Sequence, residues 1–301
     1  MNHANWKSST VGILCAIGCE TFYGLSYIFT KQATTCAGEL ALLGWRFFLA
    51  TLVMSLCILL GFIKVNLKGK PIKQLLLVAL CNPCIYFIAE TIGISHTTAS
   101  ESGVFLACIP VVSLIASTLI LKKKPSKMQL IGILITLAGV LITVFAVSAS
   151  SSLSVLGYGC LLVAVVSYAL YSVFVDKATV YTSAEITYVM LLSGAAFFVL
   201  LAVAEAGFHG TLVELVRLPF QDLSFLIAIL YQGIGCSVLA FFLSNLAISK
   251  IGVNRTSSFI GIATVVSILT GALLLREAFT GFRIVGAVVI IAGVYTANIK
   301  R

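Results

Sequence analysis

Long apolar runs, separated by short polar segments, account for most of the chain. A helix needs about 20 apolar residues to cross the hydrocarbon core of a bilayer. Runs of roughly that length occupy residues 11–30, 40–63, 75–94, 102–121, 128–147, 155–175, 186–206, 223–243, 256–275 and 282–298. Continuous runs such as 131–147 lack the period-two alternation of barrel strands. We therefore predict an all-α integral membrane protein with ten transmembrane helices.

The composition agrees with lipid as the surroundings of this chain. The 301 residues are 60% hydrophobic and only 10% charged, which is far from the composition of soluble domains. The formal net charge is +9, but the basic residues form short clusters between apolar runs and not an extended basic face. We expect a lipid bilayer and no nucleic acid among the partners. No small-residue cleavage site follows the first run, so we expect it to stay as the first span.

Lysine and arginine are divided unevenly between the two sets of connecting segments. With the N-terminus inside, the cytoplasmic side receives most of them, including the cluster Lys122-Lys123-Lys124. The opposite side holds Lys31, Arg217, Arg276 and Arg283. That side also contains the longest predicted loop, 207–222. Because cytoplasmic segments carry the excess of Lys and Arg, we predict that both termini are cytoplasmic, in agreement with an even number of spans.

The cysteine, histidine and aspartate patterns favour neither a metal site nor an enzyme. The nine cysteines lie mostly inside apolar runs, where cysteine acts as a small hydrophobic residue. The pair Cys81 and Cys84 lacks a second such pair or matching histidines. The two aspartates, Asp176 and Asp222, fall in predicted loops, and the sequence has no HExxH motif. We therefore predict no metal, no cofactor and no enzymatic activity.

The chain contains an internal repeat. A shift of 154 residues from the third span onward places Ser113 on Ser267, Gly132 on Gly286 and Gly139 on Gly293. Near the start of each half, a slightly smaller shift places Tyr23 on Tyr168. Each repeat has five spans, an odd number, so the second half must enter the membrane in the opposite sense. We predict two inverted five-helix repeats, residues 1–147 and 148–301.

The repeated glycines also predict how the fifth and tenth spans pack. Gly132 and Gly139 lie seven residues apart on one face, as do Gly286 and Gly293, and small residues allow close helix approach. We expect these spans to serve as scaffold, or as the contact of a homodimer, and not as parts of a transport pathway.

Together these features resemble the drug/metabolite transporter superfamily, specifically its ten-span members built from two EamA-type repeats. The resemblance covers nearly the whole chain. It is carried by Gly24-Leu25-Ser26-Tyr27, Trp45-Arg46, Ile109-Pro110-Val111-Val112 and Leu275-Arg276-Glu277, with Gly286 and Gly293. Where that family usually has a Gly-Glu pair after the fourth span, this chain has three lysines. The role of that glutamate therefore carries over only to Glu277, for which we expect a fold-stabilising contact.

Ionisable residues within the spans are the first candidates for a substrate site, because a charge inside a membrane is costly unless it is paired or faces water. Glu20, Arg46 and Glu90 are such residues, and Glu205 lies near the end of a span. Asn82, Tyr86 and Glu90 follow at intervals of four and share one helical face. We interpret that face as a polar wall of the site, with a buried helix contact as the alternative. Arg46 suits a substrate carboxylate, or it neutralises Glu20 or Glu90.

Polar and aromatic residues on three other faces complete the candidate site. They are Tyr23 and Tyr27 on the first span, Tyr168 and Tyr171 on the sixth, and Gln232 and Asn245 on the eighth. Tyr23 and Tyr27 continue the stripe that begins at Glu20. Asn245 lies one residue from the repeat partner of Glu90. Helix packing and polar helix contacts are the alternative to substrate contact for all six.

The resemblance implies a secondary transporter that moves a small metabolite by alternating access, with export of an amino acid or similar compound across a bacterial inner membrane. Either membrane glutamate is a candidate for binding and releasing a proton during the cycle. A facilitator or exchanger, including one for a nucleotide-sugar-like substrate, is an alternative. A membrane receptor or scaffold without transport is another.

Overall fold

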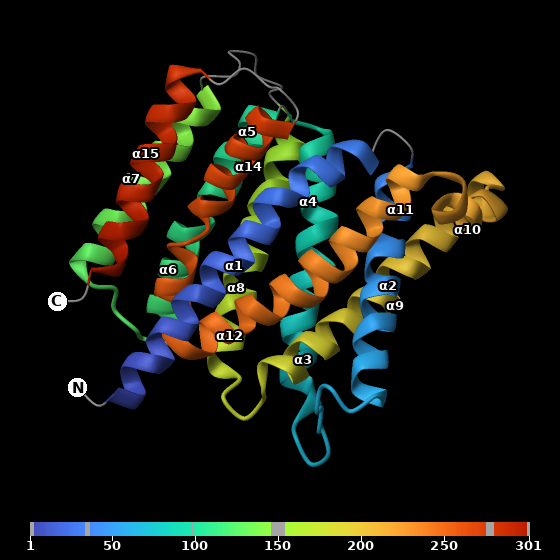
Figure 1. The fold of residues 1–301 in the computed structure, drawn as a ribbon, viewed down its shortest axis with the longest axis horizontal. Coiled ribbons are helices and arrows are strands. Elements are labelled where there is room, and N and C mark those ends of the chain that lie inside the picture. The colour runs from blue at the N-terminus through green and yellow to red at the C-terminus, as the bar shows by residue number, and fades with distance from the viewer. Residues whose placement is uncertain (1–2, 34–36, 98, 146–153, 275–279, 300–301) are drawn as a thin grey trace.

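The computed structural model describes residues 3–33, 37–97, 99–145, 154–274 and 280–299, and every regular element among them is a helix (Figure 1). The first half contains α1 (His3–Ala33), α2 (Glu39–Leu59), α3 (Ile72–Ala79), the π-helical η1 (Leu80–Ile85), α4 (Tyr86–Ser95), α5 (Ala99–Ala107), α6 (Ile109–Ile120) and α7 (Lys127–Phe145). The second half contains α8 (Val155–Lys177), α9 (Ser183–His209), α10 (Leu212–Gln221), α11 (Leu223–Leu230), the π-helical η2 (Tyr231–Ala240), α12 (Phe241–Ile251), α13 (Val253–Ser257), α14 (Gly261–Leu274) and α15 (Gly281–Asn298). The all-α prediction is confirmed over this part of the chain.

Nine helical segments in the described residues are long and apolar enough to cross a membrane. They are Glu39–Leu59, Ile72–Ser95, Glu101–Ile120, Lys127–Val144, Val155–Lys177, Ser183–His209, Leu223–Ile251, Val253–Leu274 and Gly281–Asn298. Each coincides with one apolar run, from the second run to the tenth. The first run lies within the 31-residue helix α1, which is not one of the nine. A span count of ten therefore stays a prediction.

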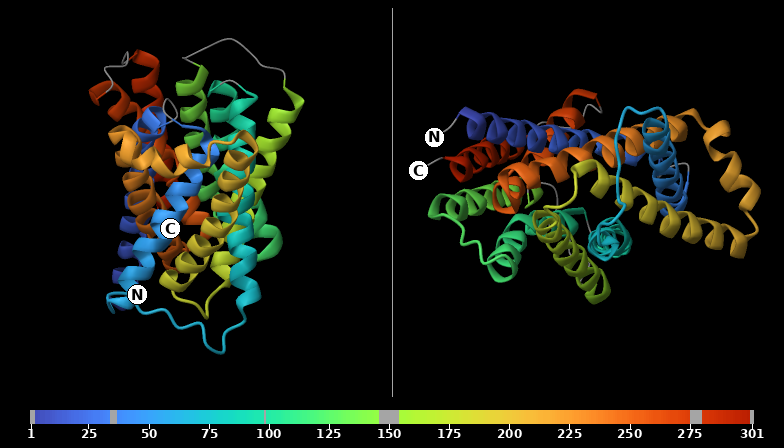
Figure 2. Two further views of the ribbon diagram at one scale, coloured as in Figure 1. Left: turned by 90° about the vertical axis from the view of Figure 1, so that its right-hand side faces the viewer. Right: turned by 90° about the horizontal axis from the view of Figure 1, so that it is seen from below.

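Successive spans run in alternate directions, so the bundle has two ends (Figures 1 and 2). We call the end at which α1 begins and α15 ends the terminal end. The connections 60–71, 121–126 and 178–182 lie at this end, whereas α2, α5, α8, α11 and α15 begin at the opposite end. Large apolar side chains such as Leu119 and Leu200 are exposed on the outside of the bundle, where lipid replaces water.

The two halves of the chain are intertwined. Helix α1 packs against α12 and α14 of the second half, and α8 packs against α4 and α6 of the first. Under the sequence repeat, α1 corresponds to α8, α12 to α4, and α14 to α6. Each of these contacts therefore has a counterpart in the other half.

Helices α7 and α15 lie side by side (Figure 1) and meet at the repeated glycines. A Cβ atom on Gly139 would lie 2.9 Å from the carbonyl oxygen of Gly286, and one on Gly293 would lie 2.7 Å from that of Gly132. Only glycine permits so close an approach. Because Gly132 meets Gly293 while Gly139 meets Gly286, the two helices run antiparallel. The glycine contact is made within one chain, so a homodimer would need other surfaces.

Two elements differ from the sequence-based expectation. The eighth span continues to Ile251, beyond the predicted end at residue 243, because its polar residues Ser244 and Asn245 are buried inside the bundle. The longest connection, predicted as loop 207–222, contains α10. Val213 and Val216 on this short helix are exposed, as is typical of a helix that lies along a membrane surface.

Candidate functional site

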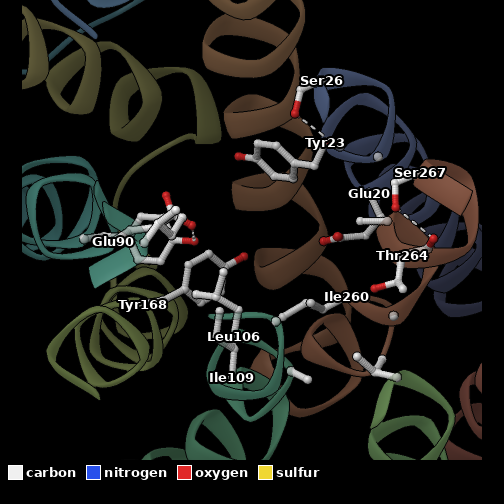
Figure 3. A pocket seen from close by; sticks show the side chains of 18 of the residues that line it. Glu20, Tyr23, Ser26, Glu90, Leu106, Ile109, Tyr168, Ile260, Thr264 and Ser267 are labelled. Carbon is white, nitrogen blue, oxygen red and sulfur yellow. Dashed lines mark hydrogen bonds between the residues drawn. The ribbon is translucent and has the colours of Figure 1, made fainter. Parts of the chain in front are cut away.

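A cavity of about 890 Å³ lies between the two halves. From the first half it is lined by the predicted residues Glu20, Tyr23, Arg46, Asn82, Tyr86 and Glu90, and from the second half by Tyr168 and Gln232. The close-up shows Glu20 and Glu90 on opposite sides of the cavity, with Tyr23 and Tyr168 between them (Figure 3). Residues from six different elements (α1, α2, η1, α4, α8 and η2) are thus brought together in one space.

Glu20 presents a carboxylate to the cavity from the middle of α1 (Figure 3). The residue is only 5% exposed. Its side chain has neither a hydrogen bond nor an ion pair with any residue that the structure describes. A carboxylate inside a membrane span normally has a partner or faces water, so the position of Glu20 is that of a group available to a ligand.

Glu90 lies across the cavity and has a partner on its own helix. The Tyr86 hydroxyl donates to Glu90 Oε1 at 2.6 Å. Asn82 lies on the same side, where η1 interrupts the span and the backbone of Asn82 is extended (φ −142°, ψ 117°). The Oδ1 atom of Asn82 is buried without a hydrogen-bond partner among the described residues. Asn82, Tyr86 and Glu90 therefore lie on one side of the cavity and leave the Asn82 acceptor without a donor among the described residues. Their contact with a substrate stays a prediction.

Arg46 is buried beside the cavity and contacts neutral groups. Its Nε donates to Ser237 Oγ at 2.7 Å and one terminal nitrogen donates to Gln232 Oε1 at 3.2 Å. The guanidinium carbon lies 4.7 Å from the ring centre of Phe87, a cation–π arrangement. Within the described residues, Arg46 forms no ion pair with Glu20 or Glu90. Its charge is held at the cavity by hydrogen bonds and an aromatic face, which leaves other guanidinium donors for a ligand.

Tyr171 and Asn245 do not line the cavity. The Tyr171 hydroxyl donates to Asn245 Oδ1 at 2.7 Å, and both side chains are at most 1% exposed. In this conformation they make the buried helix contact that was the alternative to substrate binding. The side chain of Tyr27, and Glu277 as a whole, lie outside the described residues.

Sequence reasoning missed several residues of the cavity wall. Thr264 and Ser267 of α14 face the cavity (Figure 3), and they lie three apart, a spacing that marks one helical face. Thr136 and Thr143 of α7 also line it, so the fifth span contributes to the cavity as well as to scaffold packing. Single hydroxyl residues in an apolar run carry too weak a signal to be singled out, because Ser and Thr can satisfy themselves on their own helix. Across the described residues, no three His, Cys, Asp or Glu come together to hold a metal ion.

Comparisons with known proteins agree with this architecture. A solved crystal structure superposes with a TM-score of 0.77 over 96% of this chain and 98% of its own, at 16% identity, which establishes the fold alone. The "Uncharacterized transporter YcxC" of Bacillus subtilis is 31% identical over 97% of this chain and 94% of its own length. The "WAT1-related protein At1g44800" of Arabidopsis thaliana is 25% identical over 74% of this chain and 66% of its own. The model of the EamA-like transporter family matches residues 10–145 and again 155–299. The chain is a multi-pass membrane protein that belongs to the EamA-like transporter family and contains two EamA repeats.

Proposed function

We propose that this protein is a secondary transporter that moves a small metabolite through the cavity between its two halves by alternating access. The observation that carries the proposal is the cavity itself. It is lined by both halves, lies inside membrane spans, and displays two carboxylates, Glu20 and Glu90, that form no ion pair with any described residue. A structural role alone would not require charged residues at such a site.

The packing of the two halves supports an inverted-repeat mechanism of ten spans. Helices α7 and α15 are repeat partners and run antiparallel. The contacts of α1 in the second half correspond to those of α8 in the first. Two such halves can exchange conformations about a central site.

An amino acid is the substrate class that the chemistry of the cavity favours. The Glu20 carboxylate and the acceptor Asn82 Oδ1 suit an ammonium group, and the guanidinium of Arg46 suits a carboxylate. Tyr23, Tyr86 and Tyr168 supply aromatic surface around them. The cavity volume falls within the range of small-molecule sites. As in the sequence-based prediction, we favour export.

We place the protein in a bacterial inner membrane with both termini cytoplasmic. The relatives in Bacillus subtilis support the membrane, and the lysines of the connections 60–71 and 121–126 support the orientation, because both connections lie at the terminal end. An externally added impermeant reagent in intact cells should label a cysteine placed near residue 216 and not one near residue 124, in a background without reactive native cysteines. The reverse pattern would overturn the orientation.

Flux through the purified protein tests the transport proposal. Proteoliposomes containing the full chain are loaded with a panel of labelled amino acids and other metabolites, with and without a pH gradient. We expect gradient-dependent flux that is lost in Glu20→Gln and Glu90→Gln. Glu205→Gln is the matched control, because Glu205 lies exposed on α9 and should keep wild-type flux.

The other outcomes separate the alternatives. Flux that ignores the gradient and survives both cavity substitutions would indicate a facilitator or exchanger in which the glutamates are structural. The absence of flux for every compound, nucleotide sugars included, would refute transport in favour of a receptor or scaffold.

A further inference from the structure

A layer of buried polar side chains lies between the cavity and the terminal end. Tyr171 is one helical turn beyond the cavity residue Tyr168 in the direction of that end. Its hydroxyl donates to Asn245 Oδ1, and Asn245 Nδ2 donates to Thr187 Oγ1 at 2.9 Å. On α6, Ser113 lies one turn beyond the cavity residue Pro110 and has no hydrogen-bond partner among the described residues. All four side chains of the layer (Tyr171, Asn245, Thr187 and Ser113) are at most 1% exposed.

Packing alone does not account for this layer. A polar group in the membrane interior is unfavourable unless it is fully hydrogen-bonded, and Ser113 is not. Hydrogen bonds between membrane helices are weak on average, so the bonds of Asn245 add little over an apolar residue of similar shape. Polar side chains at these positions are favourable in a second conformation of the protein in which water reaches them.

The sequence repeat connects this layer to the cavity. The shift that places Tyr23 on Tyr168 also places Ser26 on Tyr171. The larger shift of the later spans places Thr91 on Asn245, and Ser113 on Ser267. Ser26, Thr91 and Ser267 all line the cavity. Three residues of the buried layer are thus the repeat partners of three cavity residues.

Two ion pairs lie at the terminal end, and each joins one half of the chain to the other. Lys70 Nζ lies 2.6 Å from Glu185 Oε2, and the backbone N–H of Asn66 donates to the same carboxylate. Lys123 Nζ lies 2.7 Å from Asp176 Oδ1. The other oxygen of Asp176 accepts from the backbone N–H of Val253.

We infer that Tyr171, Asn245 and Ser113 line the second, presently closed half of the transport path, and that the pairs Lys70–Glu185 and Lys123–Asp176 keep it closed. The inference rests on the alternating-access transport proposed above. When the two halves exchange conformations, the buried repeat partners of Ser26, Thr91 and Ser267 become exposed to water at the terminal end. A substrate leaving Tyr168 then meets Tyr171 and Asn245.

Hydroxyl-radical footprinting of the full chain in lipid nanodiscs tests this inference, because radicals formed from water oxidise side chains that water reaches. The test variant is the double substitution Lys70→Ala/Lys123→Ala. Its matched control is Lys64→Ala/Lys124→Ala, which removes two exposed lysines of the same connections that form no ion pair among the described residues. We expect oxidation of Tyr171 to rise at least fivefold in the test variant and to stay at the wild-type level in the control. Phe198, which is 0% exposed, should stay protected in all samples and reports on unfolding.

An unchanged Tyr171 with a protected Phe198 would overturn the inference. If Phe198 also becomes oxidised in the double variant, the single substitution Lys123→Ala decides the question by the same criterion, because its ion pair is the more exposed of the two. Flux measured on the same preparations separates this inference from the transport proposal. If Tyr171 becomes oxidised in the double variant but no compound is transported, transport is refuted and the closing role of the two ion pairs stands. If the wild type transports a compound but Tyr171 stays protected in the double variant, transport stands and the closing role is overturned.

Discussion

The packing of α7 against α15 allows a quantitative prediction at Gly139. A Cβ atom there would lie 2.7 Å from the backbone nitrogen of Ile290, so reaching a carbon contact of about 3.5 Å requires the helices to separate by roughly 0.8 Å. That nitrogen and the Gly286 carbonyl oxygen, 2.9 Å away, are backbone atoms and cannot rotate away. Overpacking of this kind costs about 1–3 kcal/mol, and Gly139→Leu should fall at the upper end of that range. Gly293→Leu, at the repeat partner, should cost a similar amount.

Gly159 on α8 offers the matched control, because a Cβ atom there meets nothing within 4 Å. Leucine gains the same helix propensity over glycine at either position, so the difference between Gly139→Leu and Gly159→Leu isolates the packing penalty. Thermal unfolding in detergent, followed by the fluorescence of the two tryptophans, measures that difference. Equal midpoints for the two variants would refute the antiparallel glycine contact.

Three further substitutions test the cavity and the closed end. Arg46→Lys keeps the charge but loses the forked guanidinium that bonds both Ser237 and Gln232. Because Lys does not replace Arg at such a site, we expect flux to fall at least tenfold. Wild-type flux in this variant would show that the charge alone matters. Tyr86→Phe removes the donor to Glu90, worth about 0.5–1.5 kcal/mol, and should shift the pH dependence of flux with little loss of protein from the membrane; an unchanged pH profile would separate Glu90 from proton coupling. Glu185→Gln weakens the contacts to Lys70 and Asn66 and should make the connection 60–71 more sensitive to added protease than it is in the control Glu205→Gln. Equal cleavage in both variants would contradict a closing role for the Lys70–Glu185 pair.

The spans were predictable because the energetic rule behind them is local. Each helix must satisfy its own backbone hydrogen bonds in lipid and be apolar for about 20 residues. The apolar run 155–175 therefore predicts α8 without reference to the rest of the chain. The glycine contact was predictable for a related reason, since Gly132 and Gly139 share a face at fixed spacing. Its partner was not, because spacing does not say whether the opposing surface belongs to the same chain. The structure shows that it does.

The site was only partly predictable because a polar residue in a membrane span can either line a cavity or bond to another helix. Glu20 and Tyr171 carry the same signal in the sequence, a polar side chain at helical spacing in an apolar run. Glu20 faces the cavity, whereas Tyr171 is bonded to Asn245 on a helix far away in sequence. The position of Arg46 could not be derived either, because Ser237 and Phe87, which hold it, come from segments that only the fold brings together.

The repeat makes the scaffold symmetric, but the charges within it are not. Among the residues that the structure describes, the three carboxylates that line the cavity, Glu20, Glu39 and Glu90, all come from the first half. The repeat partner of Glu90 is Ser244, and that of Glu20 is Val165. If the two halves exchange conformations, the same few carboxylates of the first half must therefore serve the substrate in both states, which they can do only from near the centre of the bundle. Glu20 meets this requirement, because it lies one turn from Tyr23, whose partner Tyr168 lines the same cavity. A carboxylate introduced in the second half by Ser244→Glu should consequently not replace Glu90 in the double variant Glu90→Ser/Ser244→Glu, although the scaffold that surrounds the two positions is related by the repeat.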